Sequence, residues 1–190
     1  MRHRTWHSCQ PMDLHTLARQ WFISDKRIEL QKLARELGIS RATAYRWAGS
    51  AEQLVGVVLA SLVDETYKQI VKKTTSTGSE RVLEVLDRGM HSAYKFKPLR
   101  RFLAKDAQLG LRIVASNQSP VQSHTMANIQ SLLEEEVQAE RMILSVDPEV
   151  MAYALTRILE SFLYSDLITG AKPDFENASK ILELMLRQDT

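Results

Sequence analysis

Polar side chains suited to contacting a nucleic acid lie close together just after Ser40. The guanidinium groups of Arg41 and Arg46 can each make two parallel hydrogen bonds to a guanine edge or clamp a phosphate. The hydroxyls of Thr43 and Tyr45 can donate to phosphate oxygens. Ser40 itself can cap a helix, and the first N–H groups of a helix attract anions. This spacing indicates a short basic helix suited to a major groove.

Two short helices are expected to position this segment, over about residues 29–37 and 41–48. Ala34 offers a small side chain where the two helices touch. Gly38 can turn the chain tightly in the left-handed conformation. The pair therefore predicts a helix-turn-helix. The spacing by itself also fits two surface helices separated by a glycine cap, so this alternative stays open at this point.

The residues around this turn follow a wider pattern. They are Leu33-Ala34, Leu37-Gly38-Ile39-Ser40, Thr43-Ala44-Tyr45-Arg46 and Ser50. This pattern resembles the DNA-binding head of the TetR/AcrR family of transcriptional regulators, and the string Tyr45-Arg46-Trp47 with Gly49-Ser50 is similar to the QsdR-like branch. The resemblance implies a DNA-binding head joined to a helical body that binds a ligand and dimerises. It places the two parts at residues 1–60 and 61–190.

The resemblance and the chemistry together give a set of expected DNA contacts. Ala51 stands where the family often has a phosphate-clamping lysine, so other cations must supply affinity. The expected contacts are Lys26, Arg27, Ser40, Arg41, Ala42, Thr43, Tyr45 and Arg46. Residues 1–60 hold nine Lys or Arg against five Asp or Glu, and this excess is consistent with a polyanionic partner such as double-stranded operator DNA.

The composition fits an all-α protein. Among 190 residues, 44% are apolar and 25% charged, whereas the seven glycines and five prolines are too few for a turn-rich β fold. No stretch approaches the roughly 20 apolar residues that span a bilayer. No apolar region follows the basic N-terminus, so we predict no signal peptide, no membrane association and a cytoplasmic location. Cys9 alone cannot form an internal disulfide.

Helical periodicity and capping residues predict about nine helices. A loose arm over residues 1–11 is expected before the first, and Gly110 marks a candidate break in the sixth. The expected ranges are about 13–24, 29–37, 41–48, 50–73, 80–94, 98–115, 120–142, 148–169 and 174–187.

Polar-tipped residues among apolar positions of the body are candidates for binding an effector. A lactone or acyl compound, which the QsdR-like resemblance implies, would offer carbonyl groups to the donors and an apolar tail to the rest. Each residue could equally be ordinary core. The candidates are Met90, Tyr94, Phe102, Arg112, His124, Met126, Tyr153 and Phe162.

The last two helices carry more apolar surface than a single bundle needs, and the family resemblance implies a homodimer built on them. The expected contacts are Leu155, Leu159, Phe162, Leu163, Ile181, Leu182 and Met185. Two paired heads would then meet successive major grooves about 34 Å apart. The predicted function is a repressor that a small-molecule effector releases from a palindromic operator.

Two other functions stay open at this stage. One is a constitutive DNA-binding regulator or activator without a ligand, and the other is a small-molecule-binding dimer whose head contacts a protein. An enzyme is not expected, because no phosphate-binding glycine loop and no hydrolase or metalloprotease motif occurs. His3, His7, Cys9 and His15 lack paired metal-ligand spacing, so neither a metal nor a cofactor is predicted.

Overall fold

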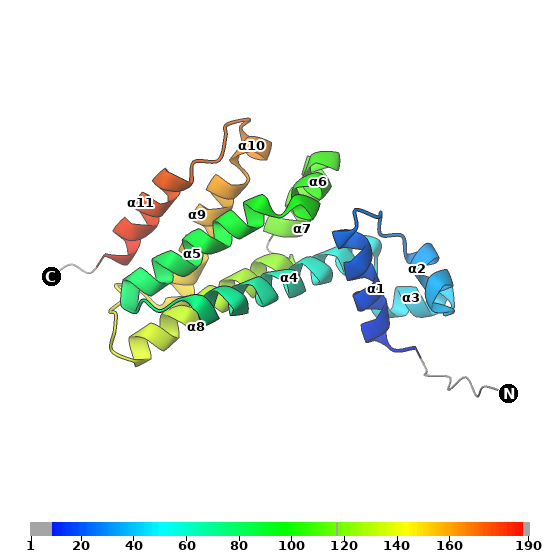
Figure 1. The fold of residues 1–190 in the computed structure, drawn as a ribbon, viewed down its shortest axis with the longest axis horizontal. Coiled ribbons are helices and arrows are strands. Elements are labelled where there is room, and N and C mark those ends of the chain that lie inside the picture. The colour runs from blue at the N-terminus through cyan, green and yellow to red at the C-terminus, as the bar shows by residue number, and fades with distance from the viewer. Residues whose placement is uncertain (1–8, 117, 188–190) are drawn as a thin grey trace. The chain divides into compact units, whose positions relative to one another are not determined.

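The computed structural model describes residues 9–116 and 118–187, and all regular structure within these ranges is helical (Figure 1). This confirms the all-α prediction. Contacts divide the chain into two compact units, the first ending at Val58 and the second beginning at Leu59. We call them the head and the body. Of the expected N-terminal arm, residues 1–8 lie outside the described ranges, and the first helix already begins at Pro11.

The head contains three complete helices and the start of a fourth. They are α1 (Pro11–Ile23), α2 (Leu30–Leu37), α3 (Arg41–Ala48) and the first residues of α4 (Ala51–Lys73). One face of each of the first three helices forms the core of the head. Its fully buried residues are Leu14 and Ala18 of α1, Leu33 of α2 and Ala44 of α3.

The turn between α2 and α3 has the geometry that its sequence predicts. Gly38 adopts the left-handed conformation with φ of 69°, which costs glycine little because it has no Cβ. The Ile39 N–H donates to the Ala34 carbonyl at 3.0 Å and closes the end of α2. Ser40 then begins α3, since its Oγ accepts a hydrogen bond of 3.0 Å from the Thr43 N–H.

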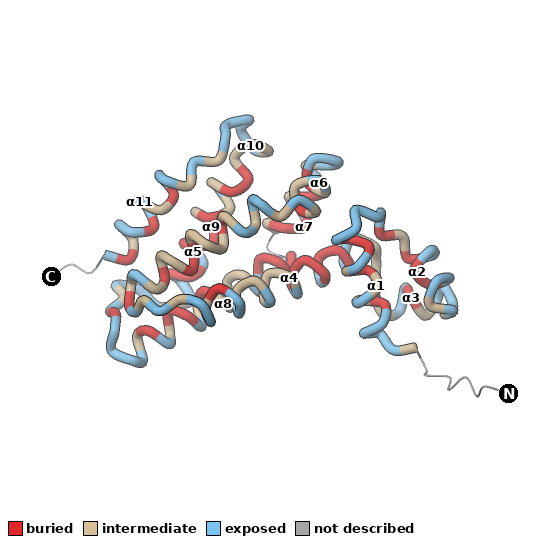
Figure 2. The backbone as a smooth tube through the Cα atoms, in the orientation of Figure 1, coloured by how far each residue is buried: buried red, intermediate tan, exposed pale blue. Residues whose placement is uncertain are grey.

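The body consists of the remainder of α4 and seven further helices. These are α5 (Gly78–Lys95), α6 (Lys97–Lys105), α7 (Ala107–Ala115), α8 (Pro120–Gln138), α9 (Pro148–Leu163), α10 (Ser165–Ile168) and α11 (Phe175–Leu186). One apolar core joins α4, α5, α8, α9 and α11, with Leu132, Leu155 and Leu182 almost completely buried. Buried and exposed stretches alternate along these helices, as amphipathic helices require (Figure 2).

Two of the expected helices are divided, which gives eleven helical segments in the described ranges. The chain breaks at Asp106, whose side chain caps α7 by accepting from the Leu109 N–H at 2.9 Å, and again at Tyr164. The break was expected at Gly110, but Gly110 lies buried inside α7. A Cβ there would come within 2.6 Å of Leu103 Cδ2, so this glycine permits close packing of α7 on α6.

A buried carboxylate joins the beginning of α5 to the end of α8. Glu136 is completely buried, and it accepts hydrogen bonds of 2.7 Å from the Gly78 N–H and from Nε of Arg141. The guanidinium group of Arg81 pairs with the same carboxylate. The hydrogen bond from Arg141 is the largest of the contacts that lower the Glu136 pKa, from 4.5 to about 2. The carboxylate is therefore charged and fully paired.

No helix in the described part of the chain is long and apolar enough to cross a bilayer.

Candidate functional site

The outward face of α3 carries most of the expected DNA contacts. Arg41, Tyr45 and Arg46 are exposed, whereas Ala44 and Ala48 point into the head and are buried. Within residues 9–116 and 118–187, these three side chains make no hydrogen bond or ion pair to another residue, so they are available to a partner. Ala42 is also exposed, and its small side chain lets a groove approach the helix closely.

The hydroxyl groups at the start of α3 are partly engaged in capping. Ser40 Oγ lies 2.9 Å from Thr43 Oγ1 and also accepts from the Thr43 backbone. Lys26 and Arg27 are exposed in the connection between α1 and α2, and Lys26 Nζ lies 5.7 Å from the centre of the Trp21 ring. The structure thus leaves Arg41, Tyr45 and Arg46 freer to bind a partner than the hydroxyls of Ser40 and Thr43.

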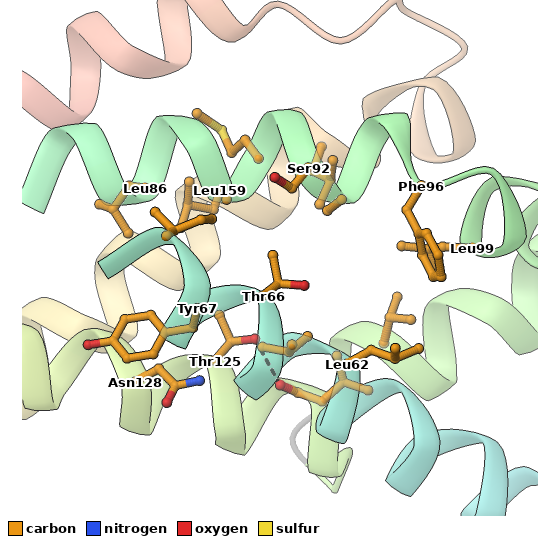
Figure 3. Close-up of a pocket in the computed structure, with 18 of the residues that line it drawn as sticks. Leu62, Thr66, Tyr67, Leu86, Ser92, Phe96, Leu99, Thr125, Asn128 and Leu159 are labelled. Atoms are coloured by element: carbon orange, nitrogen blue, oxygen red, sulfur yellow. Dashed lines mark hydrogen bonds between the residues drawn. The ribbon is translucent and has the colours of Figure 1, made fainter. Parts of the chain in front are cut away.

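The body contains a partly open cavity of about 630 Å³, lined by residues of α4 to α9 together with Tyr164. This volume lies in the range of about 300–1,000 Å³ typical of small-molecule sites. Leu62, Leu86, Leu99 and Leu159 are among its mostly apolar lining. In Figure 3, Tyr67 and Asn128 lie toward one end of the cavity, and Phe96 and Leu99 lie toward the other.

The polar groups of the cavity are mostly neutral. They include Thr66, Ser92, Thr125 and Asn128, which offer hydroxyl or amide hydrogen bonds. Lys95 adds an exposed ammonium group, and Glu160 adds a carboxylate, whose pKa is raised by burial although Arg157 donates to it at 2.7 Å. Such a lining can orient a mainly apolar molecule through a small number of hydrogen bonds.

Asp64 connects α4 to α8 beside this cavity. One of its oxygens accepts a hydrogen bond of 2.9 Å from Asn128 Nδ2, and the other lies 2.8 Å from His124 Nδ1. Asn128 also lines the cavity. The position of α4 therefore depends on a residue that a bound molecule can touch.

Family comparison identifies the body. Residues 77–187, more than half of the chain, match the family model described as "Tetracyclin repressor-like, C-terminal domain". The chain belongs to the TetR family. The match begins at Thr77, which precedes α5, and ends at Arg187, which follows α11, so it lies within the body.

Solved structures of several transcriptional regulators share the fold over nearly the whole chain. The transcriptional repressor QsdR of R. erythropolis is 26% identical, with a TM-score of 0.88 over 95% of this chain and 97% of that one. The repressor AlkX from Dietzia is 18% identical, with a TM-score of 0.63 over 95% and 94%. FadR of Bacillus subtilis, solved with stearoyl-CoA, is 13% identical, with a TM-score of 0.53 over 95% and 100%. No curated protein sequence matches the chain significantly.

One of the eight expected effector contacts, Met90, lines the cavity. Tyr94 instead packs edge-on against Phe175, and His124 binds Asp64. Tyr153 is half exposed beneath the Arg157 guanidinium. The other four are also outside the lining. They are Phe102, Arg112, Met126 and Phe162.

The part of the cavity that α4 supplies was not predicted from the sequence. Leu62, Thr66 and Tyr67 line it, yet they were expected only to extend the helix that follows the head. A signal was present, because Leu62, Thr66 and Ile70 recur at intervals of four and so share one helix face. That face needs a partner, but periodicity does not say whether the partner is protein or ligand.

The expected dimer contacts also fall into two groups. Leu155, Leu159, Leu163 and Leu182 are buried within the protomer. Phe162 and Met185 are partly exposed and pack against the body core, and Ile181 is exposed. Further apolar side chains are exposed on the same two helices. They are Val150 and Tyr153 of α9 and Leu184 of α11.

Proposed function

We propose that this TetR-family protein is a ligand-responsive transcriptional repressor, which binds a palindromic operator as a homodimer and leaves it when a small molecule occupies the body cavity. The free, exposed arginines of α3 are the observation that carries the DNA-binding part. The similar R. erythropolis protein is described as a transcriptional repressor, and this supports repression over activation.

Arg41→Ala is expected to weaken operator binding by about 10- to 100-fold, because a bidentate contact from arginine to guanine is worth about 1–3 kcal/mol. Tyr45→Phe removes one hydroxyl and should weaken binding less than Arg41→Ala does. The loss should be about the same for every DNA sequence, because the hydroxyl contacts a phosphate. Both side chains are exposed, so the melting temperature should stay that of the wild type.

The measurement is fluorescence anisotropy on an operator selected from a random-sequence DNA pool. Glu36→Ala is a matched control, because Glu36 is exposed on α2 and lies outside the expected contact set. Unchanged affinity for both α3 variants would contradict the assignment of α3 as the recognition helix.

The effector that fits the cavity is mainly apolar with a neutral polar group. Most of the lining is aliphatic or aromatic, and its hydroxyl and amide groups suit a carbonyl acceptor. A ligand carboxylate would be disfavoured near the half-buried Glu160, and the ammonium group of Lys95 lies at the exposed part of the lining. A lactone or a neutral acyl compound has this chemistry, so both belong in the first panel of compounds.

Release of DNA would proceed through α4. This helix starts in the head at Ala51 and ends in the body at Lys73, and its residues line the cavity. A ligand that engages Asn128 competes with Asp64 for the same amide, which would weaken the attachment of α4 to α8 and leave the contact between Asp64 and His124. The effector must bind the released state more tightly than the DNA-binding state, since equal affinity shifts no population.

A homodimer would form on α9 and α11, which pack against each other. Ile181 and Leu184 are among the apolar residues that these helices expose to water. Exposed apolar residues that lie together on a surface indicate an interaction site. Two copies related by a twofold axis would cover them and set the separation of two heads.

A further inference from the structure

Gly89 leaves part of the cavity wall without a side chain. It lies in the interior of α5, lines the cavity, and is half-buried. A Cβ placed there would meet no other atom within 4 Å. Leu86 and Phe96, one turn before and two turns after it, both contribute side chains to the same cavity.

The fold itself gives no reason for glycine at this position. Glycine is one of the least favourable residues in a helix interior, and Gly89 lacks the positive φ that would require it. Gly110 of α7 differs, because a Cβ there would collide with Leu103. An alanine at position 89 would be accommodated and would favour the helix, so the open space beside Gly89 is a property of the cavity.

We propose that Gly89 determines effector specificity by size: the missing side chain admits the widest part of an elongated, uncharged and largely apolar effector between α4 and α5. This inference rests on the proposed ligand response. Thr66 of α4 and Ser92 of α5, one turn after Gly89, lie on opposite sides of the cavity (Figure 3). A molecule in the cavity would therefore contact both helices close to Gly89.

Gly89→Leu is the direct test, with the apolar fluorophore N-phenyl-1-naphthylamine as the probe. The leucine side chain would occupy the space of the ligand, so the probe Kd should rise by about tenfold or more. Ala127→Leu is the control, because Ala127 is exposed on α8 and outside the cavity lining. It should bind the probe as the wild type does.

Gly89→Ala keeps the test decisive if the leucine variant fails to fold. Replacing a mid-helix glycine without a clash should raise the melting temperature by about 2–4 °C. Displacement of the probe by γ-lactones should then shift toward compounds with unbranched, narrow tails, which a merely structural role would not produce.

The outcomes separate this inference from the function on which it rests. If Gly89→Leu folds, its probe affinity decides: weaker binding supports the size role, and binding like that of Ala127→Leu shows that the size role is wrong while ligand binding stands. If Gly89→Leu does not fold, Gly89→Ala decides: a shifted lactone preference supports the size role, and the wild-type preference shows that it is wrong. If the wild type binds neither probe nor lactone, both proposals are wrong.

Discussion

Glu136→Ala is expected to lower the free energy of unfolding by about 3–5 kcal/mol, because it removes the buried carboxylate of an ionic cluster and leaves Arg81 with the exposed Glu135 as its remaining charge partner. The Arg81 side chain is only 11% exposed, so water cannot replace the lost carboxylate. The Gly78 N–H also loses its acceptor. Urea unfolding followed by circular dichroism measures the loss.

Glu135→Ala is the matched control, because Glu135 neighbours the cluster and pairs with Arg81 at 2.9 Å but its side chain is 55% exposed. An exposed pair contributes about 1 kcal/mol or less. Equal destabilisation by the two variants would show that burial of the Glu136 cluster does not stabilise the body.

The same cluster predicts how stability depends on pH. The folded-state pKa of Glu136 is about 2, below its ordinary value of 4.5. The contribution of Glu136 is therefore complete above about pH 4.5 and is lost as the pH falls toward 2. Glu136→Ala should flatten the stability profile in this window, and an unchanged profile would contradict the pairing.

Leu184→Glu is expected to convert the dimer to a monomer and to weaken operator binding by about 100-fold or more. A dimer gains affinity because the second head binds at high effective concentration, and a monomer loses this gain. Leu184 is 62% exposed in the protomer, so the charge should not disturb the protomer fold, whereas at an apolar interface it would be buried at high cost. Sedimentation velocity and operator titration measure the two effects.

Ile143→Glu is the matched control for dimerisation. Ile143 is 78% exposed and lies between α8 and α9, outside the two interface helices. The Ile143→Glu variant should remain dimeric and bind the operator with wild-type affinity. A wild type that sediments as a monomer at micromolar concentration would contradict the paired-head mechanism.

The head was predictable because its signals are local. Gly38 turns the chain and Ser40 caps α3, as expected, and Arg41 and Tyr45 lie exposed on α3; each of these signals acts within one turn of the chain. The division at Asp106 was missed because its capping hydrogen bond competes with a continuous helical pattern. Gly110 was misread because its role depends on the packing of α7 against Leu103 of α6, which helical periodicity does not show.

The cavity was less predictable because it is a property of tertiary packing. Met90 faces it, but Tyr94, four residues later on α5, turns to Phe175 of α11 instead. His124 likewise resembles a ligand donor in the sequence, whereas in the structure Asp64 of α4 engages it. These partners come from segments far apart in the sequence, and periodicity along one helix cannot identify them.

The central claim is that occupation of the body cavity releases the head from DNA. The direct measurement is the anisotropy of a labelled, selected operator bound to wild-type protein, titrated with lactones and neutral acyl compounds that displace N-phenyl-1-naphthylamine. The account predicts that at least one of these compounds weakens operator binding by about tenfold or more, and that the operator weakens its binding by the same factor. Operator affinity unchanged by every compound that enters the cavity would contradict the account and leave a constitutive DNA-binding protein.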